Sequence, residues 1–307
     1  MEKLVVIVGP TAVGKTRLSL ELAQRFNGEI VSGDSMQIYR GLSIGTAKAT
    51  LAEQAVAPHH MINIADADEH YSAARFVREA QAKIVDIQAR GKLPILVGGT
   101  GFYVQALLGD RPLAEIDDLE DTVFTQKWTQ IAMTEGEDIV REKLKQLDPV
   151  SEKRILPGQI RRLVRALLVS DHTGIPFSAQ QPAPKRRYDA YIIGLTTDRT
   201  VLYERINQRV DQMMVEGLLD EVAIAAQLPD AATAKKAIGY KELFPLLAGR
   251  EDELTATNRL KQASRRYAKR QMTWFNNQFE DIQWYDLIAD LSAENRIIED
   301  VTQFMSE

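Results

Sequence analysis

Eight residues near the start of the chain have the types and spacing of a phosphate-binding loop. Gly9-Pro10-Thr11-Ala12-Val13-Gly14-Lys15-Thr16 fits the pattern GxxxxGK[ST], follows the apolar run Leu4–Val8 and precedes an amphipathic segment. A strand, a glycine-containing loop and a helix N-terminus together direct backbone N–H groups and partial positive charge toward an anion. Lys15 would pair with phosphate oxygens, and the Thr16 hydroxyl would help to hold Mg²⁺, the expected cofactor. The motif predicts bound phosphate, but it specifies neither ATP nor hydrolysis.

Two further polar residues follow predicted strands. Phosphate-loop ATPases usually carry an acid after a second apolar strand, but Leu93–Val97 ends in Gly98-Gly99-Thr100-Gly101. An acid, Asp34, instead follows the short predicted strand Glu29–Val31. Because ligands of open α/β sheets bind at the carboxyl ends of strands, Asp34 could accept a proton from a second substrate. Thr100 could orient Asp34 or a phosphate oxygen. The alternatives are a turn-capping Asp34 and a plain glycine-rich turn around Thr100.

Arg205 and Arg209 lie one helical turn apart in a long amphipathic helix predicted over Arg199–Gln227. An arginine directed at a departing diphosphate would stabilise the charge that grows in the transition state. The alternative is a surface ion pair with Glu204 or Asp211.

Basic residues gather in two segments although the net charge is −5. One cluster contains Arg259, Lys261, Arg265, Arg266, Lys269 and Arg270 with no acid between them, and the other contains Lys153, Arg154, Arg161, Arg162 and Arg165. Either cluster alone could be a solvated helix face. Two clusters in an acidic protein favour a polyanionic partner.

Composition excludes several classes of protein. The 307 residues are 45% hydrophobic and 26% charged, which is ordinary for a globular protein with two domains or one large insertion. With no cysteine, disulfides, thiolate metal sites and a thiol nucleophile are excluded, and the four histidines suggest no metal cluster. We expect no signal peptide, no membrane span and a cytoplasmic location, because the chain enters a strand at once and lacks a long apolar run.

The order of the predicted elements indicates the fold class. Strand-like and helix-like segments alternate over the first third of the chain, and Tyr191–Leu195 resumes the strand pattern much later. We therefore expect an α/β fold with a P-loop NTPase-like parallel sheet core and an inserted helical domain. The core would comprise residues 1–109 and 189–307, the latter with a basic helix from about Thr255 to Asn277. The helical insertion would span 110–188.

Six segments in order along the chain carry a resemblance to a known enzyme family. They are residues 9–16, Ser32–Arg40 with Ile44–Lys48, Pro58–Ile62, Gly98–Tyr103, Ala237–Glu242 and Ala268–Phe275. The chain resembles the bacterial tRNA dimethylallyltransferases, also called tRNA isopentenyltransferases, over nearly its whole length.

The resemblance implies transfer of a dimethylallyl group from dimethylallyl diphosphate to N6 of the adenine on the 3′ side of the anticodon in certain tRNAs. It implies that the loop at residues 9–16 binds the prenyl diphosphate rather than ATP. Asp34 matches the general base that takes a proton from the exocyclic amine. Arg209 matches the arginine that binds the diphosphate, and Thr100 matches a threonine near the reacting centre.

The resemblance also implies a complex with the anticodon stem-loop of tRNA. The positions that match tRNA-contacting residues are Asp34, Ser35, Met36, Gln37, Arg161, Arg162, Arg165, Gly239, Tyr240, Lys241, Lys269 and Arg270. The chain departs from the family pattern at Leu156, Gly158, Gln159, Leu168 and Asn276, which bears on the tRNA contacts more than on the chemistry. We expect the protein to act as a monomer.

Three other functions share parts of this pattern. They are prenyl transfer to a free adenine nucleotide, a small-molecule kinase in which Asp34 deprotonates a hydroxyl, and a non-catalytic RNA-binding protein that senses a nucleotide. A helical insertion and two basic clusters favour tRNA over a free nucleotide. The resemblance along the whole chain disfavours the kinase, and the sensor remains to be tested at Asp34.

Overall fold

The computed structural model describes residues 2–111, 113, 122–180 and 183–307, and the chain divides into two compact units. The sheet unit contains Met1–Tyr71, Phe76–Gly109 and Arg186–Glu307, and the helical unit contains Ser72–Arg75 and Asp110–Lys185. Residues 112 and 114–121 of the predicted insertion lie outside the described residues. Each unit is described by itself.

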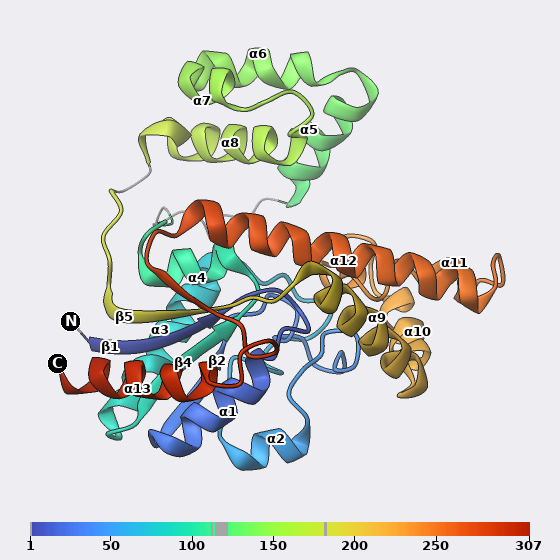
Figure 1. Ribbon diagram of the computed structural model, residues 1–307. Coiled ribbons are helices and arrows are strands. Elements are labelled where there is room, and N and C mark those ends of the chain that lie inside the picture. The colour runs from blue at the N-terminus through green and yellow to red at the C-terminus, as the bar shows by residue number, and fades with distance from the viewer. Residues whose placement is uncertain (1, 112, 114–121, 181–182) are drawn as a thin grey trace. The chain divides into compact units, whose positions relative to one another are not determined.

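The sheet unit is built on six strands in the order β3-β2-β4-β1-β5-β6 (Figure 1). The strands are β1 (Glu2–Val8), β2 (Gly28–Ser32), β3 (His59–His60), β4 (Leu93–Gly98), β5 (Tyr188–Leu195) and β6 (Ile282–Tyr285). Every neighbouring pair is parallel, so the predicted α/β class with a parallel sheet is confirmed. The sequence pattern does not reveal β3 and β6, because these edge strands are too short to show a periodicity.

Helices connect the strands and cover the sheet. They are α1 (Lys15–Arg25), α2 (Leu51–Val56), α3 (Ala73–Ala89), α4 (Gly101–Leu108), α9 (Arg199–Val215), α10 (Leu218–Gln227), α11 (Phe244–Leu247), α12 (Glu253–Gln278) and α13 (Ala293–Ser306), with the 3₁₀ helix η3 (Ala234–Lys236). The single helix predicted over Arg199–Gln227 is wrong. Gly217 adopts φ 97°, a left-handed conformation that glycine tolerates, and this residue separates α9 from α10.

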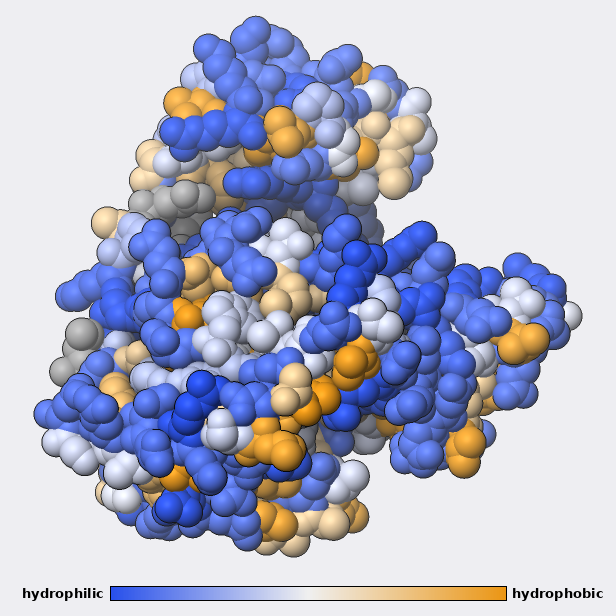
Figure 2. Space-filling view, in the orientation of Figure 1, coloured by the Kyte–Doolittle hydropathy of each residue, from blue (hydrophilic) through white to orange (hydrophobic). Residues whose placement is uncertain are grey.

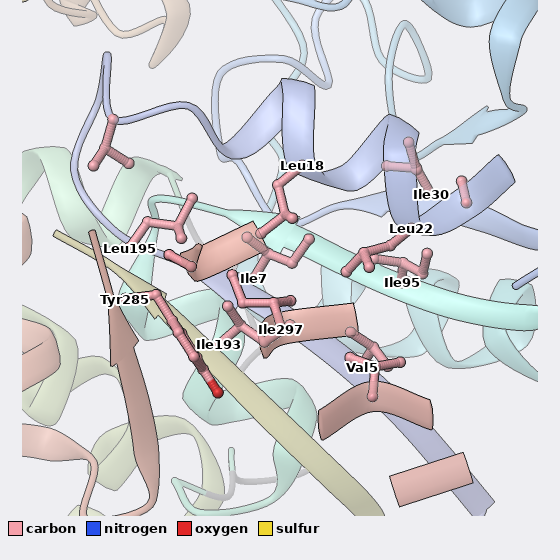
Figure 3. Close-up of a cluster of buried hydrophobic side chains, with 14 of the residues drawn as sticks. Val5, Ile7, Leu18, Leu22, Ile30, Ile95, Ile193, Leu195, Tyr285 and Ile297 are labelled. Carbon is pink, nitrogen blue, oxygen red and sulfur yellow. The ribbon is translucent and has the colours of Figure 1, made fainter. Parts of the chain in front are cut away.

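One face of the sheet carries the core shown in Figure 3. Alternate strand residues such as Val5, Ile7 and Ile193 pack against Leu18 and Leu22, which are four residues apart on α1. Residues of α9 and α13 complete this core; they include Leu202, Ile206, Ile297 and Val301. Burial of each large side chain contributes roughly 2 kcal/mol, so the phosphate loop between β1 and α1 rests on a firmly packed base.

The helical unit has a core of its own. It consists of α5 (Thr122–Thr134), α6 (Glu137–Leu147), α7 (Pro149–Arg154), α8 (Ile160–Thr173) and the 3₁₀ helix η2 (Phe177–Ala179). Val140, Leu144, Leu163 and Leu167 are fully buried between these helices. The fully buried Asp148 caps α7 by accepting from Ser151 N at 3.0 Å, and it accepts from Ser178 N at 2.7 Å.

Hydrophilic residues cover most of the face shown in Figure 2, and hydrophobic residues appear on it in separate groups. Within the described ranges, no helix combines the length and apolar character that crossing a membrane would require.

Candidate active site

Three adjacent strands end at the same edge of the sheet, and each leads into a predicted site segment. β4 lies between β2 and β1, so the turn that contains Asp34, the turn that contains Thr100 and the phosphate loop follow neighbouring strands. The first two turns touch through their main chains. Gly33 N donates to the Val97 carbonyl at 2.7 Å, and a Cβ at Gly98 would lie 2.3 Å from the Gly33 carbonyl oxygen.

A cavity of about 640 Å³ opens at this edge and lies within the sheet unit. Its polar lining includes Lys15, Thr16, Asp34, Gln37, Arg205 and Arg209. Its apolar lining includes Ile30, Ile206, Val210, Met213 and Leu260. A site that joins an anion-binding loop to an apolar wall suits a ligand with a charged head and a hydrocarbon tail.

Lys15 is held by the phosphate loop itself. Its Nζ donates to the carbonyl oxygens of Gly9 at 3.0 Å and Pro10 at 2.6 Å. Burial, assisted by the nearby positive charge of Arg209, lowers the pKa of Lys15 to about 8. Arg205 fastens the same loop by donating from Nε to the Ala12 carbonyl at 2.9 Å. Arg205 thus bonds the phosphate loop, whereas the sequence also allowed a surface ion pair with Glu204 or Asp211.

Asp34 has both of the features that the sequence offered as alternatives. Its Oδ1 accepts from Met36 N at 2.8 Å and from Gln37 N at 3.4 Å, as a turn-capping aspartate does. The same side chain lines the cavity, and burial raises its pKa despite these bonds and the charges of Lys15 and Arg209. A carboxylate with a raised pKa is a better proton acceptor than an exposed aspartate.

Arg209 reaches the cavity from α9 and makes no hydrogen bond or ion pair with any described residue. Burial lowers its pKa, while Glu53, Glu216 and Asp34 act in the opposite direction. Arginine stays protonated at physiological pH even so. Its donors are therefore available for an anionic ligand beside Lys15.

Thr100 lies next to the site but does not line the cavity. Its Oγ1 accepts from Ser35 N at 3.1 Å and donates to Ser35 Oγ at 3.3 Å. The Thr100 hydroxyl thus bonds the residue next to Asp34, and an orienting effect of Thr100 on Asp34 would pass through Ser35. Thr100 thus fixes the turn that carries Asp34.

The structure brings some of the predicted tRNA-contacting residues together. The cavity is lined by Ser35, Met36, Gln37, Gly239, Lys241 and Arg270. Lys269 is exposed on α12, and the Arg270 guanidinium lies 5.6 Å from the ring centroid of Tyr267. Tyr240 differs from these residues, because its side chain is fully buried and its hydroxyl donates to Glu221. The Tyr240 side chain supports the site rather than presenting a surface to RNA.

The remaining predicted contacts belong to the helical unit. Arg161 and Arg162 are exposed on α8, and Arg165 is partly buried. Three departures from the family pattern are exposed at the N-terminal side of this helix, namely Leu156, Gly158 and Gln159. Leu168 is buried in the same helix, and Asn276 is exposed on α12. The Leu168 side chain is therefore not available to an RNA ligand at the surface.

Sequence reasoning missed two residues that hold the site. Gln271 of α12 accepts from Thr11 N at 3.0 Å and donates to the Gly99 carbonyl at 3.0 Å. Glu221 of α10 accepts three backbone N–H bonds from residues 43–45. Both are polar residues among the buried positions of their helices, beside Ala268 and Phe275 in α12 and beside Leu218 and Val222 in α10. A buried polar side chain needs a partner, and this is the signal that could have identified them.

The donor set of the cavity fits a magnesium ion held mainly by its ligand. The Thr16 hydroxyl and the Asp34 carboxylate are oxygen donors of the kind that Mg²⁺ prefers. The described residues contain no cluster of three or more His, Asp or Glu side chains that could hold a metal. Thr16 and Asp34 would leave most positions of a six-coordinate divalent ion to water or to ligand oxygens.

Comparisons with known proteins support the family resemblance seen in the sequence. A family model described as IPP transferase matches residues 37–278. A tRNA dimethylallyltransferase of Levilactobacillus brevis is 51% identical over 100% of this chain and 99% of the relative. The corresponding enzyme of Enterococcus faecalis is 47% identical over 100% of this chain and 99% of its own length.

Two solved structures are similar to this chain over its full length. A full-length tRNA isopentenylpyrophosphate transferase from Bacillus halodurans superimposes with a TM-score of 0.72 at 42% identity, covering 100% of this chain and 99% of that one. A eukaryotic dimethylallyltransferase acting on tRNA gives a TM-score of 0.86 at 32% identity, covering 100% of this chain and 80% of its own. By its sequence, its fold and the residues gathered at its cavity, the chain belongs to the IPP transferase family.

Proposed function

We propose that this chain transfers the dimethylallyl group of dimethylallyl diphosphate to N6 of the adenine that follows the anticodon in tRNA, with release of diphosphate. The observation that carries the proposal is the cavity in which Lys15, Asp34 and Arg209 meet beside an apolar wall. Relatives at 47–51% identity over the whole chain are named tRNA dimethylallyltransferases, which supports the same reaction.

The diphosphate would occupy the loop formed by residues 9–16. Backbone N–H groups at the N-terminus of α1 and the Lys15 ammonium neutralise its charge. Arg209 supplies a second cation from α9. As the allylic C–O bond breaks, negative charge grows on the departing diphosphate, and these fixed donors stabilise it without reorganisation.

Asp34 would act as the base. The N6 amine of adenine is a weak nucleophile because its lone pair is delocalised into the ring. As the new N6–C bond forms and the C–O bond to diphosphate breaks, the Asp34 carboxylate takes the proton from nitrogen. Its position beside Lys15 and Arg209 places the base and the leaving-group cations in one cavity.

Thr16 would hold Mg²⁺ together with the diphosphate oxygens. The ion would add positive charge at the leaving group, as divalent cations do in other diphosphate reactions. The protein residues already described perform the other tasks, which are to orient the diphosphate and to remove the proton.

The tRNA partner is favoured by the basic residues around the cavity mouth. Arg270 and Lys241 line the cavity, and Lys269 is exposed on the same helix as Arg270. Cations of this kind position nucleic acid through its phosphates. The target adenine must leave its stack to reach Asp34. We further propose that the anticodon stem-loop is the bound part of tRNA, that Arg161, Arg162 and Arg165 of the helical unit contribute to its binding, and that a single copy acts on it in the cytoplasm.

The deciding experiment incubates the protein and Mg²⁺ with dimethylallyl diphosphate and unmodified tRNA, followed by mass analysis of the released nucleosides. We expect one adenosine to gain one dimethylallyl group. Parallel reactions replace tRNA by AMP, and dimethylallyl diphosphate by ATP. Prenylation of AMP with no reaction of tRNA would replace the proposal by the free-nucleotide reaction. Phosphoryl transfer from ATP would replace it by a kinase.

A further inference from the structure

Glu221 is a buried carboxylate whose hydrogen bonds are made almost entirely to main chain on another segment. Its Oε1 accepts from Ser43 N at 2.6 Å and Ile44 N at 2.7 Å, and its Oε2 accepts from Gly45 N at 2.9 Å. The side chain comes from α10, and only 8% of the residue is exposed. One carboxylate thus satisfies three successive N–H groups that would otherwise be left without partners.

The turn that Glu221 holds forms part of the cavity. Gly45, Thr46 and Ala47 line it, and Ala47 adopts a positive φ of 52°, which is uncommon for a residue with a side chain. Tyr240 also donates to Glu221 Oε2 at 3.2 Å. The Tyr240 ring packs against Gly45, where an added Cβ would lie only 2.7 Å from a ring carbon. Glu221 and Tyr240 therefore hold this turn from one side.

The other side of the turn is joined to Asp34 through Gln37. The Gln37 Nε2 donates to the carbonyls of Thr46 at 3.3 Å and Ala47 at 3.2 Å. Its Oε1 accepts from Ser32 Oγ at 2.9 Å, at the end of β2. Its backbone N–H points to Asp34 Oδ1 at 3.4 Å. A continuous set of hydrogen bonds therefore runs from Glu221 through the turn and Gln37 to the predicted base.

We propose that Glu221 is a positioning residue: by holding the turn of residues 43–47 it fixes Gln37 and thereby the direction of the Asp34 carboxylate in the cavity. Glu221 itself does not line the cavity, so its action on the reaction passes through other residues. The catalytic part of this inference rests on the proposed function, whereas the structural part does not.

The test uses Glu221→Gln, which keeps the shape but replaces one acceptor oxygen by an NH₂ group that cannot accept. We expect kcat for tRNA prenylation to fall about 10- to 100-fold, because small displacements of a reacting group have effects of this size. The Kd for dimethylallyl diphosphate without tRNA should stay within about twofold, because the phosphate loop is not bonded to Glu221. Glu221→Asp keeps the charge and should recover part of the rate.

Asp148→Asn is the matched control. Asp148 is also a buried carboxylate that accepts from backbone N–H groups, Ser151 N at 3.0 Å and Ser178 N at 2.7 Å, and it does not line the active-site cavity. Its replacement should lower the melting temperature about as much as Glu221→Gln does while leaving kcat unchanged. An equal loss of kcat in both variants, or no loss in Glu221→Gln, would overturn the positioning role.

A double-mutant cycle with Gln37→Ala tests the route. If Glu221 acts through Gln37, the double variant should lose no more activity than the more impaired single variant. Fully additive losses would contradict the route.

Amide hydrogen exchange separates this inference from the proposed function. In Glu221→Gln the amides of residues 43–45 should exchange faster, followed by those of Met36 and Gln37, whatever reaction the protein catalyses. Unchanged exchange at these amides would refute the role of Glu221 even if tRNA is prenylated. Faster exchange in a protein that prenylates nothing would refute only the proposed function.

Discussion

The side-chain oxygen of Gln271 accepts a hydrogen bond from the backbone N–H of Thr11 at 3.0 Å. The two residues are 260 positions apart, and the bond joins helix α12 to the phosphate loop. The amide group of the same side chain donates to Gly99 at the end of β4. A Cβ at Gly99 would lie 2.2 Å from the Gln271 nitrogen, so a side chain at this position would displace the Gln271 amide from its bond. One amide therefore fixes the loop, the strand end and the basic helix together.

Gln271→Ala should lower kcat/KM for dimethylallyl diphosphate about tenfold, because two hydrogen bonds worth roughly 1 kcal/mol each no longer hold the loop. Steady-state kinetics with saturating tRNA would measure this. Gln262→Ala, an exposed position on the same helix, is the control and should leave the value unchanged. Equal values for Gln271→Ala and the control would show that the loop is held by other contacts.

Replacing Asp34 separates its two roles. Asp34→Asn keeps an oxygen that can accept from Met36 N but loses the basic carboxylate, whereas Asp34→Ala loses both. We expect the chemical step to fall at least about 100-fold in both variants, with tRNA binding retained. Single-turnover rates and a tRNA binding assay would measure these effects. Turnover near the wild-type rate in Asp34→Asn would remove this residue from the base role.

Lys269→Ala and Arg270→Ala should weaken tRNA binding and flatten its dependence on salt. Each phosphate contact that is lost reduces the slope of log K against log salt by about 1. Titrations between low and moderate salt would give the slopes. Lys83→Ala removes an exposed lysine of α3 and serves as the charge-matched control. Slopes identical to that control would exclude α12 from the tRNA surface.

The value of kcat/KM should depend on pH through two groups, one that must be deprotonated and one that must be protonated. Asp34 must be ionised to accept a proton, so kcat/KM should rise with pH through its raised pKa. Lys15 must be protonated to bind diphosphate, so kcat/KM should fall above its pKa of about 8 in the free enzyme. Lys15→Arg should move the falling limb to higher pH, because arginine does not titrate in this range. A falling limb that stays near pH 8 in this variant would assign it to another group.

Stability in acid should depend on Glu29, which is buried in β2, between the edge strand β3 and β4. Its carboxylate bonds Arg90, accepts from Lys92 Nζ at 2.7 Å and lies 2.7 Å from His60 Nε2. These groups, Arg90 first, hold the pKa of Glu29 far below its usual value of 4.5. A carboxyl group with a lowered folded-state pKa contributes stability that is present above pH 4.5 and is lost as the pH falls below it.

Glu29→Gln should therefore lower the free energy of unfolding by roughly 3 kcal/mol at pH 7. The free energy of unfolding of this variant should also fall much less below pH 4.5 than that of the wild type. Urea unfolding at several pH values would measure both effects, with Glu299→Gln on the exposed surface of α13 as the control. If the free energy of unfolding of Glu29→Gln falls in acid as much as that of the wild type, other carboxylates cause the fall.

The parts of the site that the sequence predicts are those encoded by short local patterns. The phosphate loop combines an apolar strand, two glycines and Lys15 within a few residues, and Asp34 directly follows a strand. Strand order could not be predicted, yet the alternation of strands and helices was enough to expect a parallel sheet whose strand ends share one edge.

The rest depends on contacts between distant segments. No local pattern in α10 or α12 shows that Glu221 meets residues 43–45 or that Gln271 meets Thr11. The break between α9 and α10 escaped because the apolar spacing continues across Gly217, and a glycine alone does not end a helix. The burial of Tyr240 also depends on a distant contact. Nothing in the sequence around Tyr240 shows that Gly45, by lacking a side chain, leaves space for the tyrosine ring.

The contact between Gly33 and Gly98 has a consequence for redesign of the enzyme. Because backbone atoms of the Asp34 turn and the Thr100 turn are in direct contact here, a side chain at Gly98 would push the turn that carries Asp34 out of place. A variant intended to accept a longer isoprenoid should therefore be sought by shortening Met213 or Val210, apolar residues of α9 that line the cavity, and not by substitutions in these glycine turns.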